Sequence, residues 1–133
     1  MEQKIERVAG ADLDVAEVLA VYASSGLGDR RPVGDRERFA AMLANADLVM
    51  TCRIGGTLVG IARSVSDFSY VTYLSDIAVA KEFQRSGIGR ALIDATRREA
   101  PAAKIVLLSA PAAAEYYPRI GFDRHSSAWV LNP

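Results

Sequence analysis

Apolar positions along the chain recur with two different periods, which separates expected helices from expected strands. Val15, Val18, Leu19 and Tyr22 follow the i, i+3, i+4, i+7 spacing of one helix face. The same spacing predicts three further helices, one after residue 35 and two at 88–99 and 112–120. Short β-rich runs predict strands at residues 4–9, 47–54, 57–65, 70–80, 104–109, 122–124 and 128–131. The order predicts a mixed α/β (α+β) fold of about seven strands and four helices.

Length and composition narrow the function classes. The 133 residues fit one domain, expected to span residues 1–133. Sixteen basic residues balance sixteen acidic ones, and a net charge of zero disfavours nucleic acid as a partner. No apolar run reaches the roughly 18 residues of a membrane span, and the N-terminal residues lack a secretory core, so we expect a cytoplasmic protein without a membrane partner. One cysteine, Cys52, and one histidine, His125, disfavour a disulfide or a metal site.

The segment 84–91, Gln-Arg-Ser-Gly-Ile-Gly-Arg-Ala, follows an expected strand and opens an expected helix. The first turn of a helix offers unpaired N–H groups and a positive dipole end, which together bind anions. Gly87 and Gly89 leave the backbone accessible, and Arg85 and Arg90 can add charged contacts. The alternative is that the segment is only a glycine-rich strand-to-helix corner that binds no ligand, because such a corner has the same sequence pattern. The segment lacks the Lys-Ser/Thr of a P-loop, which disfavours an ATPase.

Two segments resemble the GCN5-related N-acetyltransferases. Residues 74–79, Leu-Ser-Asp-Ile-Ala-Val, with the run 84–92, are similar to motif A of that family. Residues 114–122, Ala-Glu-Tyr-Tyr-Pro-Arg-Ile-Gly-Phe, resemble its late motif. The two motifs occur in the family's order, and the order of elements agrees over nearly the whole chain. The resemblance implies the family's mostly antiparallel mixed sheet with two splayed central strands, and acetyl-CoA as the acyl donor.

The resemblance also implies which residues bind the donor. In the family it lies between the splayed strands, here the strand ending at Val79 and the run 104–109. The implied donor-binding residues are Ile77, Ala78, Val79, Gln84, Arg85, Ser86, Gly87, Ile88, Gly89 and Arg90. The backbone N–H of Ile77 is expected to stabilise the carbonyl oxygen. Tyr117 is the expected general acid, since a phenol stays protonated at neutral pH; a core aromatic is the alternative. Ala110 departs from the asparagine that many relatives carry.

The general base and the acceptor site remain open at the level of sequence. Asp76 is the only acid on its expected strand, so it is a base, a proton relay or a structural carboxylate. Deprotonation through water, without a dedicated side chain, is an equal alternative. Phe68, Tyr70 and Tyr73 predict an aromatic wall of the acceptor pocket, although aromatic residues also favour strands for packing reasons.

The resemblance implies an acyltransferase that moves an acetyl group from acetyl-CoA to the primary amine of a small molecule, by direct attack and without a metal. A distant resemblance to small arylalkylamine acetyltransferases favours an aromatic amine. Two alternatives stay open: a non-catalytic acyl-CoA-binding or regulatory module, and an acetyltransferase for a protein or peptide amine, which needs an open groove. A homodimer, common in this family, is expected.

Overall fold

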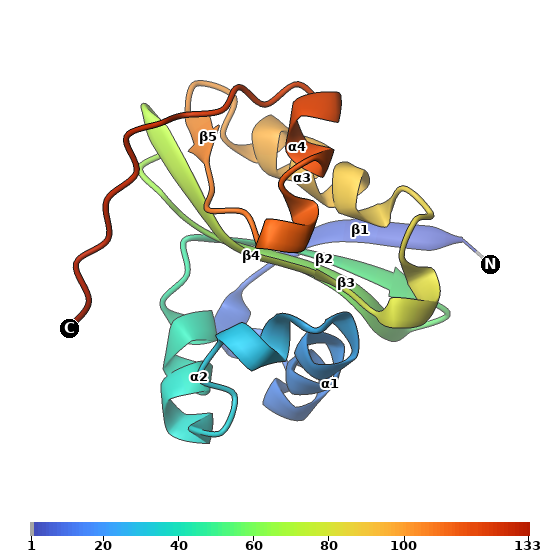
Figure 1. Ribbon diagram of the computed structural model, residues 1–133. Helices are drawn as coiled ribbons and strands as arrows, with labels where there is room; N and C mark the ends of the chain where they lie inside the picture. The colour runs from blue at the N-terminus through green and yellow to red at the C-terminus, as the bar shows by residue number, and fades with distance from the viewer. Residues whose placement is uncertain (1) are drawn as a thin grey trace.

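The computed structural model describes residues 2–133 and is built around a five-stranded sheet in the order β1-β2-β3-β4-β5 (Figure 1). Neighbouring strands from β1 to β4 are antiparallel, and β5 lies parallel to β4. The strands are β1 (Gln3–Val8), β2 (Leu48–Ile54), β3 (Thr57–Ser66), β4 (Val71–Val79) and β5 (Lys104–Val106). The sheet therefore runs in chain order, with one crossover between β4 and β5.

Helices cover both faces of the sheet. Figure 1 shows α1 and α2 below it, and α3 and α4 above it. The α-helices are α1 (Val15–Ser25), α2 (Arg36–Ala44), α3 (Ile88–Glu99) and α4 (Tyr116–Arg119), with short 3-10 turns at Gly10–Asp12, Leu27–Arg30, Lys81–Phe83 and Pro111–Ala113. Each helical layer encloses its own apolar core: Leu92 and Leu74 belong to the core on the α3 side, and Tyr22 and Phe39 to the core on the α1/α2 side. No described helix is long and apolar enough to cross a bilayer.

Local sequence signals account for several boundaries. The Asp14 side chain accepts a 3.1 Å hydrogen bond from the Ala16 N–H, and the Asp35 side chain accepts one of 3.0 Å from the Arg38 N–H. Both aspartates therefore cap their helices. Gly55 and Gly56 adopt φ values of 59° and 82°, which suit the two-residue turn that joins β2 and β3.

The end of the chain departs from the expected pattern. Residues 122–124 and 128–131 form no strands, so the sheet has five strands where seven were expected. β5 stops at Val106 instead of residue 109, and the last helix is divided between a 3-10 turn and a short α4. Trp129 and Leu131 are 93% and 98% exposed. A strand forms only when a neighbour accepts its hydrogen bonds, and this apolar segment has no partner strand among the described residues.

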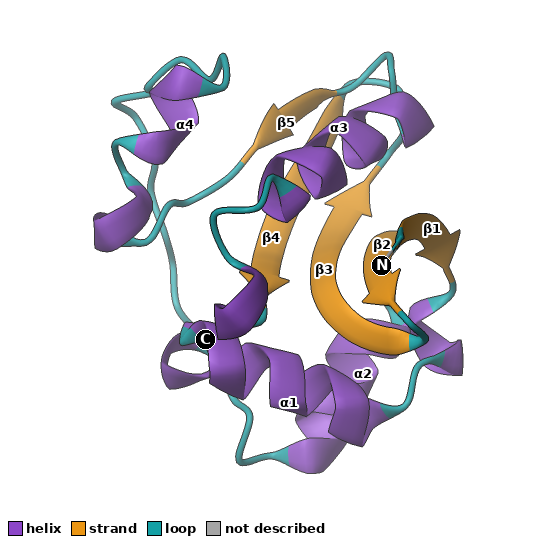
Figure 2. Cartoon of the chain, turned by 90° about the vertical axis from the view of Figure 1, so that its right-hand side faces the viewer, coloured by secondary structure: helices purple, strands orange, loops and turns teal. Residues whose placement is uncertain are grey.

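The last two strands separate soon after they meet. β4 and β5 pair at only three positions, Val71 with Lys104, Thr72 with Ile105, and Tyr73 with Val106. β4 then continues to Val79 with no strand on that edge in the described part of the chain. Figure 2 shows the two strands diverging below their paired ends. The splayed central strands expected from the sequence are thus present, and they expose one edge of β4.

Candidate active site

A β-bulge in β4 lies just beyond the point where β5 separates. Leu74 pairs with Ser64 and Asp76 pairs with Arg63, so Ser75 is the extra residue. Leu74 is buried in the core on the α3 side, whereas Asp76 is buried against Tyr22 of α1. Residues two apart in a regular strand share one face, so the bulge is what sends these two side chains to opposite faces.

Beyond the bulge, the backbone of β4 is open on one side. The Ala80 N–H donates a 2.8 Å bond to the Val59 carbonyl of β3. Because backbone groups alternate along an antiparallel strand, Ala78 also faces β3, and Ile77 and Val79 turn their N–H and carbonyl groups toward the gap beside β5. These are two of the residues that the sequence assigned to donor binding. The position fits a ligand that pairs with β4 as an added strand would.

The glycine-rich loop lies at the end of this gap, before α3. Gly87 occupies the N-cap position with φ of 88° and supplies no side-chain cap, and Arg85 also has a positive φ, 62°. A Cβ built on Gly87 would meet nothing within 4 Å, and one on Gly89 would meet only the Tyr116 Oη, at 3.8 Å. The space in front of the first turn of α3 is therefore open, and its N–H groups and dipole fit an anionic group such as a pyrophosphate.

Polar side chains shape the loop on either side of the glycines. The Gln84 Nε2 donates a 2.9 Å hydrogen bond to the Val79 carbonyl, and the Ser86 hydroxyl donates to the Phe83 carbonyl. The Arg90 Nε lies 4.0 Å from the Asp94 carboxylate, and the Arg90 side chain is 62% exposed. An exposed pair at this distance holds its partners weakly, so the Arg90 guanidinium is available to an anion.

Tyr117 of α4 lies on the α3 side of the sheet. Its ring makes edge contacts with Tyr116 at 5.3 Å and with Phe122 at 5.4 Å between centroids. It borders a hollow of about 940 Å³ that α3, β5 and the segment after α4 enclose. Burial, with a smaller contribution from Tyr116, raises the pKa of Tyr117 above that of a free phenol. The phenol is therefore protonated at neutral pH, as a proton donor must be.

The three aromatic residues assigned to the acceptor pocket lie in different surroundings. Phe68 packs against the α3-side core, with the Arg7 guanidinium 5.3 Å from its ring centroid. Tyr70 is 66% exposed and accepts a 3.0 Å hydrogen bond from Lys104 Nζ. Tyr73 is 37% exposed and lies beside the bulge. The described aromatic pairs do not join these three rings to one another. Phe68 and Tyr70 precede β4, whereas Tyr73 is the last residue of β4 that pairs with β5, so of the three only Tyr73 borders the opening of the strands.

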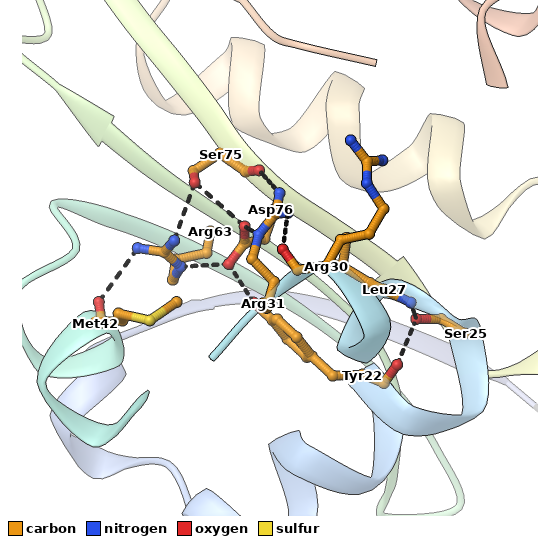
Figure 3. Close-up of polar contacts among 9 residues, drawn as sticks. All are labelled: Tyr22, Ser25, Leu27, Arg30, Arg31, Met42, Arg63, Ser75 and Asp76. Atoms are coloured by element: carbon orange, nitrogen blue, oxygen red, sulfur yellow. Dashed lines mark hydrogen bonds and ion pairs between the residues drawn. The ribbon is translucent and has the colours of Figure 1, made fainter. Parts of the chain in front are cut away.

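Asp76 is the centre of a buried polar network (Figure 3). Its Oδ1 accepts a 2.6 Å hydrogen bond from Arg31 Nε, and its Oδ2 accepts bonds of 2.7 Å from Arg63 Nε and 2.6 Å from the Tyr22 hydroxyl. Arg31 Nη2 also donates to the Ser75 carbonyl at 2.7 Å, and Arg63 Nη2 to the Ser75 hydroxyl at 3.0 Å. We call these five residues the Asp76 cluster. They tie α1, the α1–α2 connection and β3 to the bulge.

Of the three roles considered for Asp76, its surroundings favour that of a structural carboxylate. Burial alone would raise the pKa of Asp76, but the hydrogen bonds and charge of Arg63, with the contacts of Tyr22 and Arg31, lower it below its usual value. The side chain has no exposed surface, and both oxygens are occupied. A carboxylate held in its ionised form by four side-chain donors, of which the Ser75 hydroxyl at 3.2 Å is the fourth, is a poor proton acceptor.

The sequence analysis assigned no role to three donors of this network. Tyr22 was expected only as a helix-face residue, and Arg31 lies 45 positions from Asp76. Arg63 offered one signal, since it stands in the otherwise apolar run of β3 and is 8% exposed. A charged residue on a buried strand requires a partner, but the sequence does not say which one. Among the described residues, no group of three metal-binding side chains forms.

Comparison with known proteins connects this geometry to a family. A family model described as an acetyltransferase (GNAT) domain matches residues 22–132. A protein named histone acetyltransferase TAP1 from Glycine max is 28% identical over 129 residues, which cover 86% of this chain and 54% of that protein. The chain thus spans about half the length of the curated relative that it matches.

Solved structures share the fold at low sequence identity. A GNAT-family acetyltransferase from Streptococcus pneumoniae TIGR4 superposes with a TM-score of 0.78 at 20% identity, over 99% of this chain and all of that one. An aminoglycoside acetyltransferase from an uncultured soil metagenomic sample, in complex with sisomicin, has a TM-score of 0.71 at 19% identity and coverages of 98% and 96%. A ribosomal-protein-alanine N-acetyltransferase from Brucella melitensis has 0.73 at 18%, with 99% of each chain covered. Because the family model covers most of the chain and the solved structures share its fold, the protein belongs to the GNAT acetyltransferase family.

Proposed function

We propose that the protein transfers the acetyl group of acetyl-CoA to the primary amine of a small molecule. The observation that carries this proposal is the edge of β4 at Ile77 and Val79, which pairs with no strand among the described residues and leads to the open N-terminus of α3. On this edge the Val79 carbonyl already accepts a hydrogen bond from Gln84 Nε2. One face of the gap offers backbone hydrogen bonds, and its end offers a site for a pyrophosphate. Acetyl-CoA carries an amide arm and a pyrophosphate, so the two features fit two parts of one donor molecule.

In this proposal Ile77 and Val79 pair with the amide arm of the donor, and residues 84–90 hold its phosphates. Acetyl-CoA supplies a thioester carbonyl as the electrophile. The amine nitrogen attacks the carbonyl carbon, so that a C–N bond forms and the C–S bond breaks. The Ile77 N–H donates to the carbonyl oxygen as negative charge develops there. Tyr117 protonates the departing thiolate, and the proton of the attacking nitrogen leaves to water.

The names of the similar proteins include acetyltransferases for small molecules and for proteins. One is named as an aminoglycoside acetyltransferase and another as a ribosomal-protein-alanine N-acetyltransferase, while the curated relative is named as a histone acetyltransferase. Low identity gives none of these substrates to this chain. A small amine is proposed because Tyr73, an aromatic side chain that is 37% exposed, lies at the last pair before β4 and β5 separate and offers a contact surface for an apolar amine.

Donor binding can be tested by calorimetry with acetyl-CoA and matched arginine variants. Arg85→Ala and Arg90→Ala are each expected to weaken binding by about 5- to 10-fold, the effect of one charge-assisted contact. Arg98→Ala, at the other end of α3, is the control and should bind as the wild type does. An absence of binding at millimolar acetyl-CoA would refute the proposal. Acceptors are then identified by release of free thiol across a panel of small amines and peptides.

A further inference from the structure

The Asp76 cluster carries a surplus positive charge. The guanidinium groups of Arg31 and Arg63 both contact the single carboxylate of Asp76. Tyr22 is neutral, because burial and the charge of Asp76 raise the pKa of its phenol far above the ordinary value. The polar groups around Asp76 come from all the elements packed against it. Tyr22 lies on α1, Arg31 on the α1–α2 connection, Arg63 on β3 and Ser75 on β4. From α2 only the Met42 carbonyl takes part, and it lies 3.4 Å from Arg63 Nη1. No second carboxylate contacts this network in residues 2–133.

This surplus charge is fixed close to the place where β4 and β5 part. Arg31 Nη2 donates to the carbonyl of Ser75, the bulge residue, at 2.7 Å. Ile77, whose N–H faces the gap, follows two residues later, which is about 7 Å along a strand. The side chains of Arg31 and Arg63 are 21% and 10% exposed, so water screens the charge only in part. Figure 3 shows the guanidinium of Arg31 turned into the cluster and that of Arg30 turned away from it.

We propose that this buried surplus charge does the work of a general base by keeping the bound acceptor amine in its neutral, nucleophilic form. The inference rests on the proposed function above. A nearby positive charge disfavours an ammonium group and favours the free amine, so the amine sheds its proton to water before attack and needs no carboxylate to take it. The same charge favours the negative charge that develops on the thioester oxygen. It accounts for an active site in which the carboxylate of Asp76, the one acidic residue of β4, is already engaged and does not serve as the base.

The cluster also constrains the acceptor. An amine with one positive charge loses it on binding, whereas a polycation keeps its other charges near the two arginines and is repelled. We therefore infer a monoamine acceptor, in contrast to the polycationic substrates that an aminoglycoside acetyltransferase takes.

Two substitutions of opposite charge separate this role from a structural one. Arg31→Gln removes a positive charge, and we expect the acidic limb of kcat against pH to move up by about one pH unit, the effect of a unit charge near 7 Å in a partly screened site. The profile is measured at saturating acetyl-CoA and saturating small amine, because kcat reports the pKa values of groups in the enzyme–substrate complex. Asp76→Asn removes the negative charge and should move the limb in the opposite direction. Arg31→Lys keeps the charge and should leave the limb in place.

The matched control is Arg53→Gln. Arg53 makes a bidentate ion pair with Glu17, in which Nη1 and Nη2 each lie 2.8 Å from a carboxylate oxygen. This pair joins β2 to α1, away from the bulge. This variant should leave the acidic limb where it is in the wild type. A purely structural cluster would lower the rate at every pH without moving the limb, and that result for Arg31→Gln would overturn the inference while the proposed function stood.

A second measurement does not depend on acetyl transfer. Tyr73 pairs with Val65, and Asp76 with Arg63, so Tyr73 and Asp76 share a face of the sheet. In Tyr73→Cys the new thiol should react with iodoacetamide at lower pH than in Tyr73→Cys/Arg31→Gln, while buried Cys52 stays unmodified. Equal thiol pKa values in the two proteins would overturn the inference. If the thiol shift is present but no amine is acetylated, the electrostatic inference survives and the proposed function fails.

Discussion

At the scale of single residues, surroundings decide what a carboxylate can do. Asp76 stands in a segment that resembles a catalytic motif, but two arginines and a tyrosine occupy its oxygens. Removal of one partner from a buried ion pair leaves the others uncompensated, which is costly. Asp76 therefore belongs to the stability of the fold and the electrostatics of the bulge rather than to direct proton transfer.

Asp76→Asn should lower the free energy of unfolding at neutral pH by about 3–5 kcal/mol. The folded state holds the pKa of Asp76 below its unfolded value, so its contribution is present above the unfolded pKa and is lost as pH falls through the folded one. Urea unfolding from neutral pH into the acid range should show a flatter pH dependence for the variant. Glu17→Gln, which breaks a more exposed pair, should cost less than about 1 kcal/mol; an equal cost for both variants would contradict this account.

Tyr117→Phe tests the proton donor. We expect kcat to fall about 100-fold, the lower end of the range for general acid catalysis, with an unchanged KM for acetyl-CoA. Phe122→Leu, which alters the ring contact but keeps the phenol, should retain most of kcat. Equal rates for the wild type and Tyr117→Phe would remove Tyr117 from the acid role, and loss of activity in Phe122→Leu alone would point to packing.

At the scale of elements, the site depends on how β4 ends and α3 begins. β4 separates from β5 after three pairs, and Gly87 then turns the chain into the helix with a left-handed backbone. The gap and the anion site are thus consecutive parts of one strand–loop–helix unit. A substitution that strains the turn should act on donor binding and on stability together.

Gly87→Ala places a side chain at φ of 88°, although a Cβ there would meet no atom within 4 Å. Backbone strain alone should then cost about 1–2 kcal/mol and weaken acetyl-CoA binding in calorimetry. Gly34→Ala is the matched control, because its Cβ also meets nothing and its φ is not left-handed; its stability should be unchanged or slightly higher. Equal stabilities and donor affinities for the two variants would contradict a strained turn.

The sequence predicts the parts of this unit that depend on neighbouring residues. Gly87 opens α3 where the segment 84–91 predicts a helix start, because this feature involves residues a few positions apart. The Asp76 cluster was not predictable in the same way. Arg31 and Asp76 meet only when the α1–α2 connection folds onto β4, and no local pattern encodes that contact.

At the scale of the whole molecule, the end of the chain is the part that departs most from its pattern. The short apolar run at 128–131 predicts a strand, but strand formation depends on a partner, and β5 is too short to offer a long edge. The segment therefore leaves Trp129 almost fully in water. The expected homodimer stays a prediction.

Trp129 is the single tryptophan and so reports on this segment alone. Because its side chain is 93% exposed, its fluorescence should resemble that of indole in water, and unfolding in urea should barely change the emission wavelength or the quenching by acrylamide. Trp129→Phe should abolish the signal. A blue-shifted, protected emission in the native protein would mean that the segment packs against this chain or a second copy.

The measurement that decides whether the chain is a small-molecule acetyltransferase is release of free thiol from saturating acetyl-CoA across a panel of monoamines, polyamines, amino acids and peptides, with products identified by mass spectrometry. We expect one thiol released for each N-acetylated monoamine, with slower turnover on polycationic amines. Tight donor binding with no acetylated product from any amine would contradict the account, and so would transfer to peptides alone.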